Sequence, residues 1–176
     1  MPLAQLPNAL TVLRFALVPV FIVLLATASG GRSWPAAIVF VLAAITDQVD
    51  GWLARRWRVE SEFGKYADPL ADRLMIDAAV LLLVLDGRLP WVALVLVVAR
   101  DALLIAGTRL LVPRGYEFSV SLLGKIATWV LYASIACLLV TPEGTQWPLW
   151  IFWAGVVLAV VAAIPYALSA WKVVRP

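Results

Sequence analysis

Long apolar runs separated by short polar connections make up most of this chain. Six of the runs are each long enough to cross a bilayer as an α-helix, which needs about 20 mostly apolar residues. They cover about residues 8–28, 34–57, 64–85, 89–112, 119–140 and 146–174. The connections carry helix-ending glycines, as in Ser29-Gly30-Gly31 and Asp86-Gly87-Arg88. The pattern therefore predicts an all-α integral membrane protein with six transmembrane helices.

The ends of these runs give further expectations. Leu6-Pro7-Asn8 marks the start of the first run, with Asn8 as its N-cap. Met1 to Pro7 lacks the basic region and cleavage site of a signal peptide, so the first run should be retained. Pro165 predicts a kink in the last run. No polar stretch is long enough for a second folding unit, so residues 1–176 should form one membrane domain.

Composition excludes an ordinary soluble domain. The chain is 64% hydrophobic, whereas soluble domains are close to half apolar with about a quarter charged residues. Several of the nine tryptophans fall near predicted helix ends, where indole rings prefer the membrane interface. Histidine is absent, so acid–base chemistry would have to use carboxylates. The single cysteine, Cys137, lies in an apolar run and is interpreted as a packing residue.

Basic residues in the connections predict the orientation in the membrane. One side of the predicted bundle holds the second and fourth connections and the C-terminus, and the other side has only Arg32 and Arg88. The basic residues of the first side are Arg56, Arg58, Arg109, Arg114, Lys172 and Arg175. Because cytoplasmic connections are enriched in lysine and arginine, both termini should face the cytoplasm, in an inner (plasma) membrane.

A polar stretch from Asp47 to Asp72 lies between the second and third runs. Asp47 and Asp50 are three residues apart and Asp68 and Asp72 are four apart, so each pair occupies one face if the chain is helical. Four carboxylates brought together would repel one another without a cation, and Mg2+ and Mn2+ prefer oxygen ligands of this kind. The stretch therefore predicts a divalent-metal site at the cytoplasmic membrane edge.

Small and basic residues accompany these aspartates. Gly51 and Gly64 would allow a ligand to approach the backbone closely, and Arg55 lies one helical turn after Gly51. Metal ions neutralise phosphate oxygens and arginine binds them with two hydrogen bonds. This combination favours a diphosphate ligand, specifically a nucleotide diphosphate ester.

The pattern Asp47-x2-Asp50-Gly51-x2-Ala54-Arg55-x8-Gly64-x3-Asp68-x3-Asp72 resembles the signature of the CDP-alcohol phosphotransferases, membrane enzymes of phospholipid synthesis. The resemblance extends over nearly the whole chain and implies two Mg2+ or Mn2+ ions. It makes Asp47, Asp50 and Asp68 metal ligands, and Asp72 both the candidate catalytic base and a candidate ligand of the second ion. The residues implied for CDP binding are Asn8, Thr11, Gly51, Ala54, Arg55 and Gly64. The family also implies a homodimer, CDP-diacylglycerol as donor and CMP as product.

Four basic residues favour an anionic acceptor alcohol: Arg14, Arg100, Arg109 and Lys125. Glycerol 3-phosphate is the first choice, because Pro7 to Arg14 also resembles the phosphatidylglycerophosphate synthases. Phosphatidylglycerol is the alternative, since Arg100-Asp101 and the single Lys125 are closer to the CMP-forming cardiolipin synthases. Arg14 and Lys125 could instead be snorkelling residues at the membrane interface.

Other interpretations predict different chemistry. Asp77 would be a support for the active site or, preferably, a buried partner of Arg73 or Arg100. A divalent-cation transporter would also place aspartates in its spans, although usually near the midplane. A non-catalytic lipid-binding protein would not need every position of the signature. Membrane lipids are expected partners, and no nucleic-acid partner is predicted.

Overall fold

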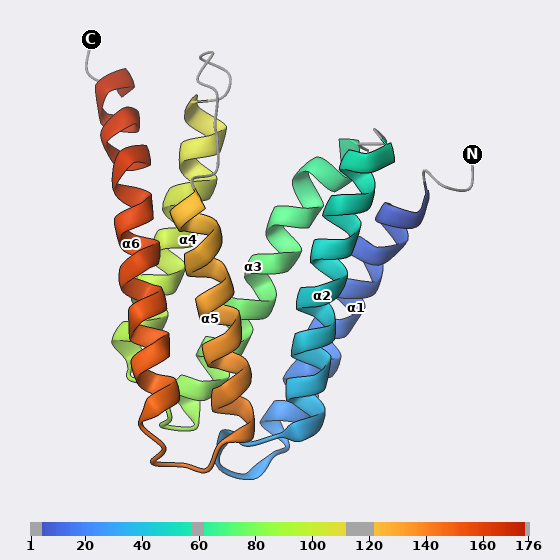
Figure 1. Ribbon diagram of the computed structural model, residues 1–176, viewed down its shortest axis with the longest axis vertical. Coiled ribbons are helices and arrows are strands. Elements are labelled where there is room, and N and C mark those ends of the chain that lie inside the picture. The colour runs from blue at the N-terminus through green and yellow to red at the C-terminus, as the bar shows by residue number, and fades with distance from the viewer. Residues whose placement is uncertain (1–4, 58–61, 112–121, 175–176) are drawn as a thin grey trace.

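The computed structural model describes residues 5–57, 62–111 and 122–174, which form six α-helices, one short 3-10 helix and no strand. Each apolar run predicted above contains one α-helix. The helices are α1 (Gln5–Ala26), α2 (Trp34–Trp57), α3 (Glu62–Leu85), α4 (Trp91–Leu111), α5 (Leu122–Val140) and α6 (Trp147–Val174), and the 3-10 helix is η2 (Ser29–Gly31). Figure 1 shows the start of α1 and the end of α6 at the same end of the bundle.

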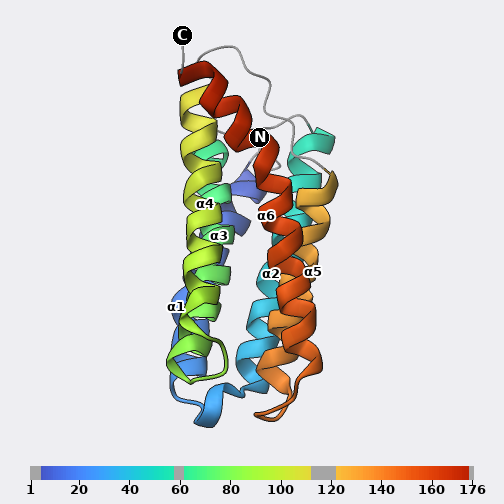
Figure 2. The same cartoon turned by 90° about the vertical axis from the view of Figure 1, so that its left-hand side faces the viewer.

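The described helices start and end within three residues of the predicted runs. α1 begins at Gln5, so Asn8 lies inside the helix and the N-cap prediction is wrong. Pro7 is tolerated there because a proline in the first helical turn removes no intrahelical hydrogen bond. At its other end α1 stops at Ala26 and Ala28 is extended; Gly30 and Gly31 in the following η2 both have φ of 63°, a left-handed conformation that glycine adopts readily. α6 continues through Pro165, and its final turns lean toward α4 in Figure 2.

The six helices form a closed ring in which each packs mainly against two neighbours. The order around the ring is α1, α2, α5, α6, α4, α3 and back to α1. Sequence neighbours therefore do not always pack together: α4 lies against α6 rather than α5, and α2 touches α3 only slightly. α1 packs against both α2 and α3, and Figure 1 shows the end of α2 and the start of α3 at the end of the bundle where α1 begins.

Aromatic side chains join three consecutive helices of the ring. The rings of Phe21 on α1 and Phe40 on α2 have centroids 5.6 Å apart, and those of Phe40 and Tyr132 on α5 are 5.3 Å apart. Phe21 and Phe40 are completely buried. Tilted pairs at these separations add to the free energy gained from burial alone. This aromatic chain fixes α2 between α1 and α5 in the half of the bundle away from the signature.

Arg88 ties together the connections at the end opposite the signature. It is buried, and its guanidinium donates to the carbonyl oxygens of Gly31 and Thr141 at 3.0 Å and also to that of Leu138. Burial lowers the pKa of Arg88, and the charges of Glu143 and Asp86 oppose that shift. Because the last carbonyls of a helix have no partner within the helix, Arg88 acts as a C-cap for α5 supplied by another connection.

The outer surface and helix composition fit a membrane protein. Among the described residues, Leu122–Val140 and Trp147–Pro165 are long and apolar enough to cross a bilayer, and Val12–Ala26 and Trp34–Thr46 are shorter apolar helical stretches. Large apolar side chains on the outside of several helices are well exposed, including Val23, Leu85 and Val157. Such continuous apolar surface is unfavourable in water and suits contact with lipid.

Candidate active site

The signature residues lie on two helices that meet at one end of the bundle. Asp47 and Asp50 are in the last turns of α2, and Asp68 and Asp72 are in the first turns of α3. The backbone is helical at all four positions, so each pair shares one helix face, as predicted. The chain reverses between Trp57 and Glu62, and Figure 1 shows both helix ends at the end of the bundle where α1 starts.

The described side chains do not include those of the predicted metal and CDP sites. Gly51, Ala54 and Arg55 belong to α2, Gly64 to α3, and Asn8 and Thr11 to α1, but their side-chain surroundings lie outside the described part. Among the side chains that are described, no group of three or more acidic, histidine or cysteine residues could hold a metal ion. The predicted metal ligands therefore stay a prediction, because their side chains lie outside the described part of the structure.

Arg14 is deeply buried on α1. Only 1% of its surface is exposed, although it lies in an otherwise apolar helix. A snorkelling arginine extends its charged group to water at the membrane surface, so this burial is inconsistent with the snorkelling alternative. A buried guanidinium needs a polar partner, which fits the prediction that Arg14 serves a functional site.

Asp101 on α4 binds two arginines through one carboxylate oxygen. Its Oδ1 accepts hydrogen bonds from Nη1 of Arg73 on α3 and Nη1 of Arg100, both at 2.8 Å. Arg73 Nη1 also donates to the backbone carbonyl of Asp101 at 3.1 Å. The side chains of Asp101, Arg100 and Arg73 are 4%, 11% and 22% exposed, so this is a largely buried cluster. The adjacent charges Arg100 and Asp101 of α4 therefore face neighbouring helices.

Arg100 extends this cluster to α5. Its Nη2 donates to Oγ1 of Thr128 at 3.3 Å, and Thr128 Oγ1 donates to the carbonyl of Gly124 at 3.0 Å. Lys125 follows Gly124 in the same turn and is exposed. The structure therefore brings Arg100 to the first turns of α5. Arg14 lies on a helix whose main neighbours are α2 and α3, and the side chain of Arg109 on α4 is outside the described part.

Asp77 forms no salt bridge with Arg73 or Arg100 among the described residues. Both arginines bind Asp101 instead, and Asp77 Oδ1 is buried without a hydrogen-bond partner among the described residues. Asp77 still lies within electrostatic range of all three charged groups. Asp77 is thus an electrostatic neighbour of both arginines, and the direct salt bridges go to Asp101, which reaches Arg73 across the α3–α4 contact, a pairing that sequence spacing does not reveal.

Arg73 and Arg88 donate hydrogen bonds that join different segments of the chain, and the sequence pattern did not predict these contacts. Arg73 was considered only as a partner of Asp77, although its position directly after Asp72 and its charge inside an apolar run signalled a specific partner. Arg88 was counted only as a charge in a connection. Its position directly after Gly87 gave no sequence signal of burial, because the carbonyls it binds come from other segments.

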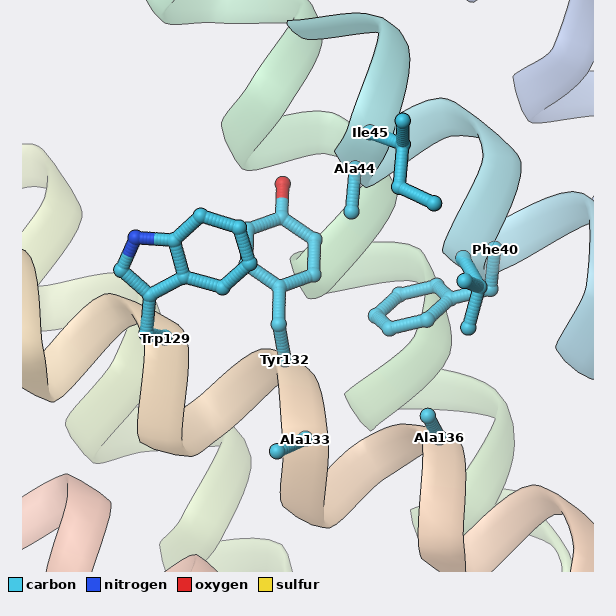
Figure 3. A pocket seen from close by; sticks show the side chains of 8 residues that line it. Phe40, Ala44, Ile45, Trp129, Tyr132, Ala133 and Ala136 are labelled. Carbon is cyan, nitrogen blue, oxygen red and sulfur yellow. The ribbon is translucent and has the colours of Figure 1, made fainter. Parts of the chain in front are cut away.

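An apolar groove runs between α2 and α5. It has a volume of about 180 Å³. Figure 3 shows side chains of α2 on one side and of α5 on the other. The lining residues are Phe40, Val41, Ala44, Ile45, Trp129, Tyr132, Ala133 and Ala136. Ile45 is two residues before Asp47, so the groove reaches within one helical turn of the signature.

Comparison with known proteins gives consistent matches over nearly the whole chain. Residues 4–161 match the model of the CDP-alcohol phosphatidyltransferase family. The CDP-diacylglycerol–glycerol-3-phosphate 3-phosphatidyltransferase of Bacillus subtilis is 34% identical, with 97% of each chain covered. The proteins of the same name from Salmonella paratyphi A and Escherichia coli are 32% and 31% identical, with 97% of this chain and 92% of theirs covered.

Proposed function

This chain belongs to the CDP-alcohol phosphatidyltransferase family, and we propose that it transfers the phosphatidyl group of CDP-diacylglycerol to glycerol 3-phosphate with release of CMP. The observation that carries the proposal is the complete signature on the adjoining ends of α2 and α3, in a chain similar over nearly its full length to enzymes named for this reaction. The product would be phosphatidylglycerophosphate.

In the proposed reaction, the acceptor hydroxyl attacks the β-phosphorus of CDP-diacylglycerol. A new P–O bond forms, the bond to the CMP oxygen breaks, and no covalent enzyme intermediate is required. Asp72 accepts the proton of the attacking hydroxyl, which makes the oxygen a stronger nucleophile. Arg55 and the small residues Gly51 and Gly64 bind the diphosphate and let it approach the helix backbone.

Divalent ions fit the donor set of the signature. Carboxylate pairs at helical spacing supply the hard oxygen ligands that Mg2+ and Mn2+ prefer, and the residues that would hold two ions are Asp47, Asp50, Asp68 and Asp72. When bound, the ions would neutralise phosphate charge that develops during transfer. The protein's own part is to orient the diphosphate and the acceptor, which removes much of the entropic barrier of a two-substrate reaction.

The groove between α2 and α5 supports a lipid donor. Its lining is apolar, its residues Ile45 and Trp129 are exposed on the outside of the bundle, and Ile45 is two residues before Asp47 in the chain. An acyl chain of CDP-diacylglycerol could lie there while its diphosphate reaches the signature. Burial of each methylene of such a chain would add about 0.8 kcal/mol to binding.

We propose the same membrane arrangement as that predicted from the sequence. All six helices would span the inner membrane, with the termini and the signature on the cytoplasmic side. The positions of the first turn of α1, the last turn of α6 and the α2–α3 reversal at one end of the bundle support this arrangement (Figure 1). Labelling of single cysteines placed near both termini, in intact cells and in lysed cells, would test it; labelling in intact cells by an impermeant reagent would contradict it.

The chain is proposed to act as a homodimer, on family resemblance. Cross-linking in native membranes should yield a species of twice the mass of the chain. Recovery of monomer alone, under conditions that cross-link a known membrane dimer, would contradict this part of the proposal.

The decisive experiment separates the acceptors. Purified enzyme is given CDP-diacylglycerol, Mg2+ or Mn2+, and either glycerol 3-phosphate or phosphatidylglycerol, and the lipid product is identified by mass spectrometry. Phosphatidylglycerophosphate is the expected product. Cardiolipin formed from phosphatidylglycerol, with no product from glycerol 3-phosphate, would overturn the choice of acceptor and identify the alternative function. Metal-dependent CMP release distinguishes either transferase from a transporter or a lipid-binding protein.

A further inference from the structure

We propose that Asp101 is a positioning residue for phosphatidyl transfer: it holds Arg73 and Arg100 and so fixes the rotation of α3 relative to α4 and α5. The inference rests on the proposed function, because it concerns the orientation of the helix that carries Asp68 and Asp72. Asp101 itself need not touch either substrate. It acts through Arg73, which directly follows Asp72 in the chain.

The contacts between Arg73 and Asp101 constrain both distance and rotation. Arg73 Nη1 donates to the Asp101 carboxylate at 2.8 Å and to the Asp101 backbone carbonyl at 3.1 Å. A bond to the backbone of α4 ties α3 to the helix itself rather than to a movable side chain. Two acceptors on one residue leave the guanidinium little freedom to turn, so α3 is held in one rotational setting.

Arg100 adds a third helix to the same carboxylate. It donates to Asp101 Oδ1 at 2.8 Å and to Thr128 Oγ1 at 3.3 Å, and so joins α4 to α5. α3 otherwise packs mainly against α1 and α4, with few contacts to α5. We term this group of Arg73, Arg100, Asp101 and Thr128 the α3–α4–α5 clamp. It links α4 to α5, which are not neighbours in the ring, as well as α3 to α4.

Burial makes the clamp sensitive to the charge of Asp101. The Asp101 side chain is only 4% exposed. The Nη1 atoms of Arg73 and Arg100 lie within about 6 Å of each other, because both contact Asp101 Oδ1. Without the negative charge of Asp101, the two guanidinium groups would repel each other in a medium of low dielectric constant. Asp77 is within electrostatic range but forms no salt bridge with either arginine, so loss of the Asp101 charge leaves both guanidinium groups without their direct anionic partner, and the two arginines should separate.

A small rotation of α3 would matter for the reaction. A group about 6 Å from a helix axis moves by about 2 Å when the helix turns by about 20°. Misplacement of a reacting group by about 1 Å can lower a rate by about 100-fold. Loss of the clamp should therefore lower kcat while substrate binding by other residues persists.

The test compares Asp101→Asn, Arg73→Gln and the double variant with the wild type, using Glu143→Gln in an exposed connection as a control. We expect Asp101→Asn to lower kcat at least tenfold and to change the KM for CDP-diacylglycerol by less than about threefold. If Asp101 acts through Arg73, the double variant should be no worse than the poorer single variant. Asp101→Glu should recover part of the lost kcat. The proposal would be overturned if Asp101→Asn had the kcat of the wild type. It would also be overturned if the loss of kcat in the double variant equalled the product of the losses in the two single variants.

A distance measurement tests the clamp independently of activity. Spin labels are placed at Leu74 on α3 and Leu122 on α5, both exposed, in a Cys137→Ala background. The wild type should give one narrow distance distribution, and Asp101→Asn and Arg73→Gln should broaden or shift it, while Glu143→Gln should not. Should Asp101→Asn fail to fold, Arg73→Gln provides both readouts. An unchanged distribution in the folded variants would refute the clamp, and an inactive wild type with a clamp-dependent distribution would refute only the proposed function.

Discussion

Replacement of Arg88 by methionine should destabilise the fold at the end of the bundle opposite the signature. Methionine keeps an unbranched apolar side chain but donates no hydrogen bond. The buried carbonyls of Gly31, Leu138 and Thr141 would then lose their charged donor. Hydrogen bonds to charged groups contribute roughly 1.5–3 kcal/mol each, but water reaching the opened connections would recover part of this, so a net loss of about 3–4 kcal/mol is expected.

This loss corresponds to a large change in melting temperature. For a chain of about this length, 1 kcal/mol shifts Tm by about 2–4 °C, so Arg88→Met should melt roughly 6–15 °C below the wild type. The Tm of Arg88→Lys should lie between those of Arg88→Met and the wild type, because an ammonium group keeps the charge but cannot reach the same set of carbonyls. The measurement is thermal unfolding in detergent followed by tryptophan fluorescence, at one scan rate for all variants.

Arg32→Met provides the matched control. Arg32 lies at the same end and donates to the carbonyl of Val140 at 3.0 Å, but its bond is exposed. Its loss should cost less than about 1 kcal/mol, because water replaces an exposed partner. A Tm for Arg88→Met within 2 °C of the wild type by the same assay, or an equal loss in Arg32→Met, would refute the reasoning that burial gives Arg88 its importance.

Three further predictions concern the reaction. Asp72→Asn should abolish CMP release while the protein still inserts and folds, as measured by the CMP assay and by size exclusion in detergent; substantial CMP release would remove Asp72 as the base. EDTA should abolish activity and added Mg2+ or Mn2+ should restore it, whereas full turnover in EDTA would contradict a metal site. Ala133→Phe should raise the KM for CDP-diacylglycerol several-fold by filling the α2–α5 groove, and Ala154→Phe, on the exposed face of α6, should not. Equal KM values for these two variants would show that the groove does not hold the acyl chain.

Sequence pattern was sufficient to locate the helices because their ends are local. Gly30 and Gly31 lie in the connection after α1, where their left-handed backbone conformations are ones that glycine adopts readily. The predicted runs beginning near Trp34 and Gln146 correspond to α2 and α6, which start at Trp34 and Trp147. The N-cap prediction for Asn8 was wrong because this residue, of a type common at N-caps, lies just inside a helix that starts at Gln5.

Long-range partners could not be predicted in the same way. The sequence showed that Arg73, Asp77, Arg100 and Asp101 were charges in apolar runs and needed partners. It could not show that α4 packs against α3 at the height where Asp101 meets Arg73, because that depends on the order of helices in the ring. The signature itself was readable because its spacing is short and helical, and the side-chain geometry of that site stays a prediction.

The order of helices in the ring also bears on how the chain enters the membrane during synthesis. α4 carries the adjacent charges Arg100 and Asp101, and of its two main neighbours only α3 has been made when α4 emerges from the ribosome. Arg73 of α3 is therefore the first partner from another helix that Asp101 can meet, and in the proposed membrane arrangement their pairing would offset the unfavourable transfer of α4 into lipid. The ring closes later, when the α5–α6 hairpin fills the space between α2 and α4. A nascent chain that ends after α4 should already retain four inserted helices, whereas the same chain with Arg73 replaced by leucine should release α4 from the bilayer.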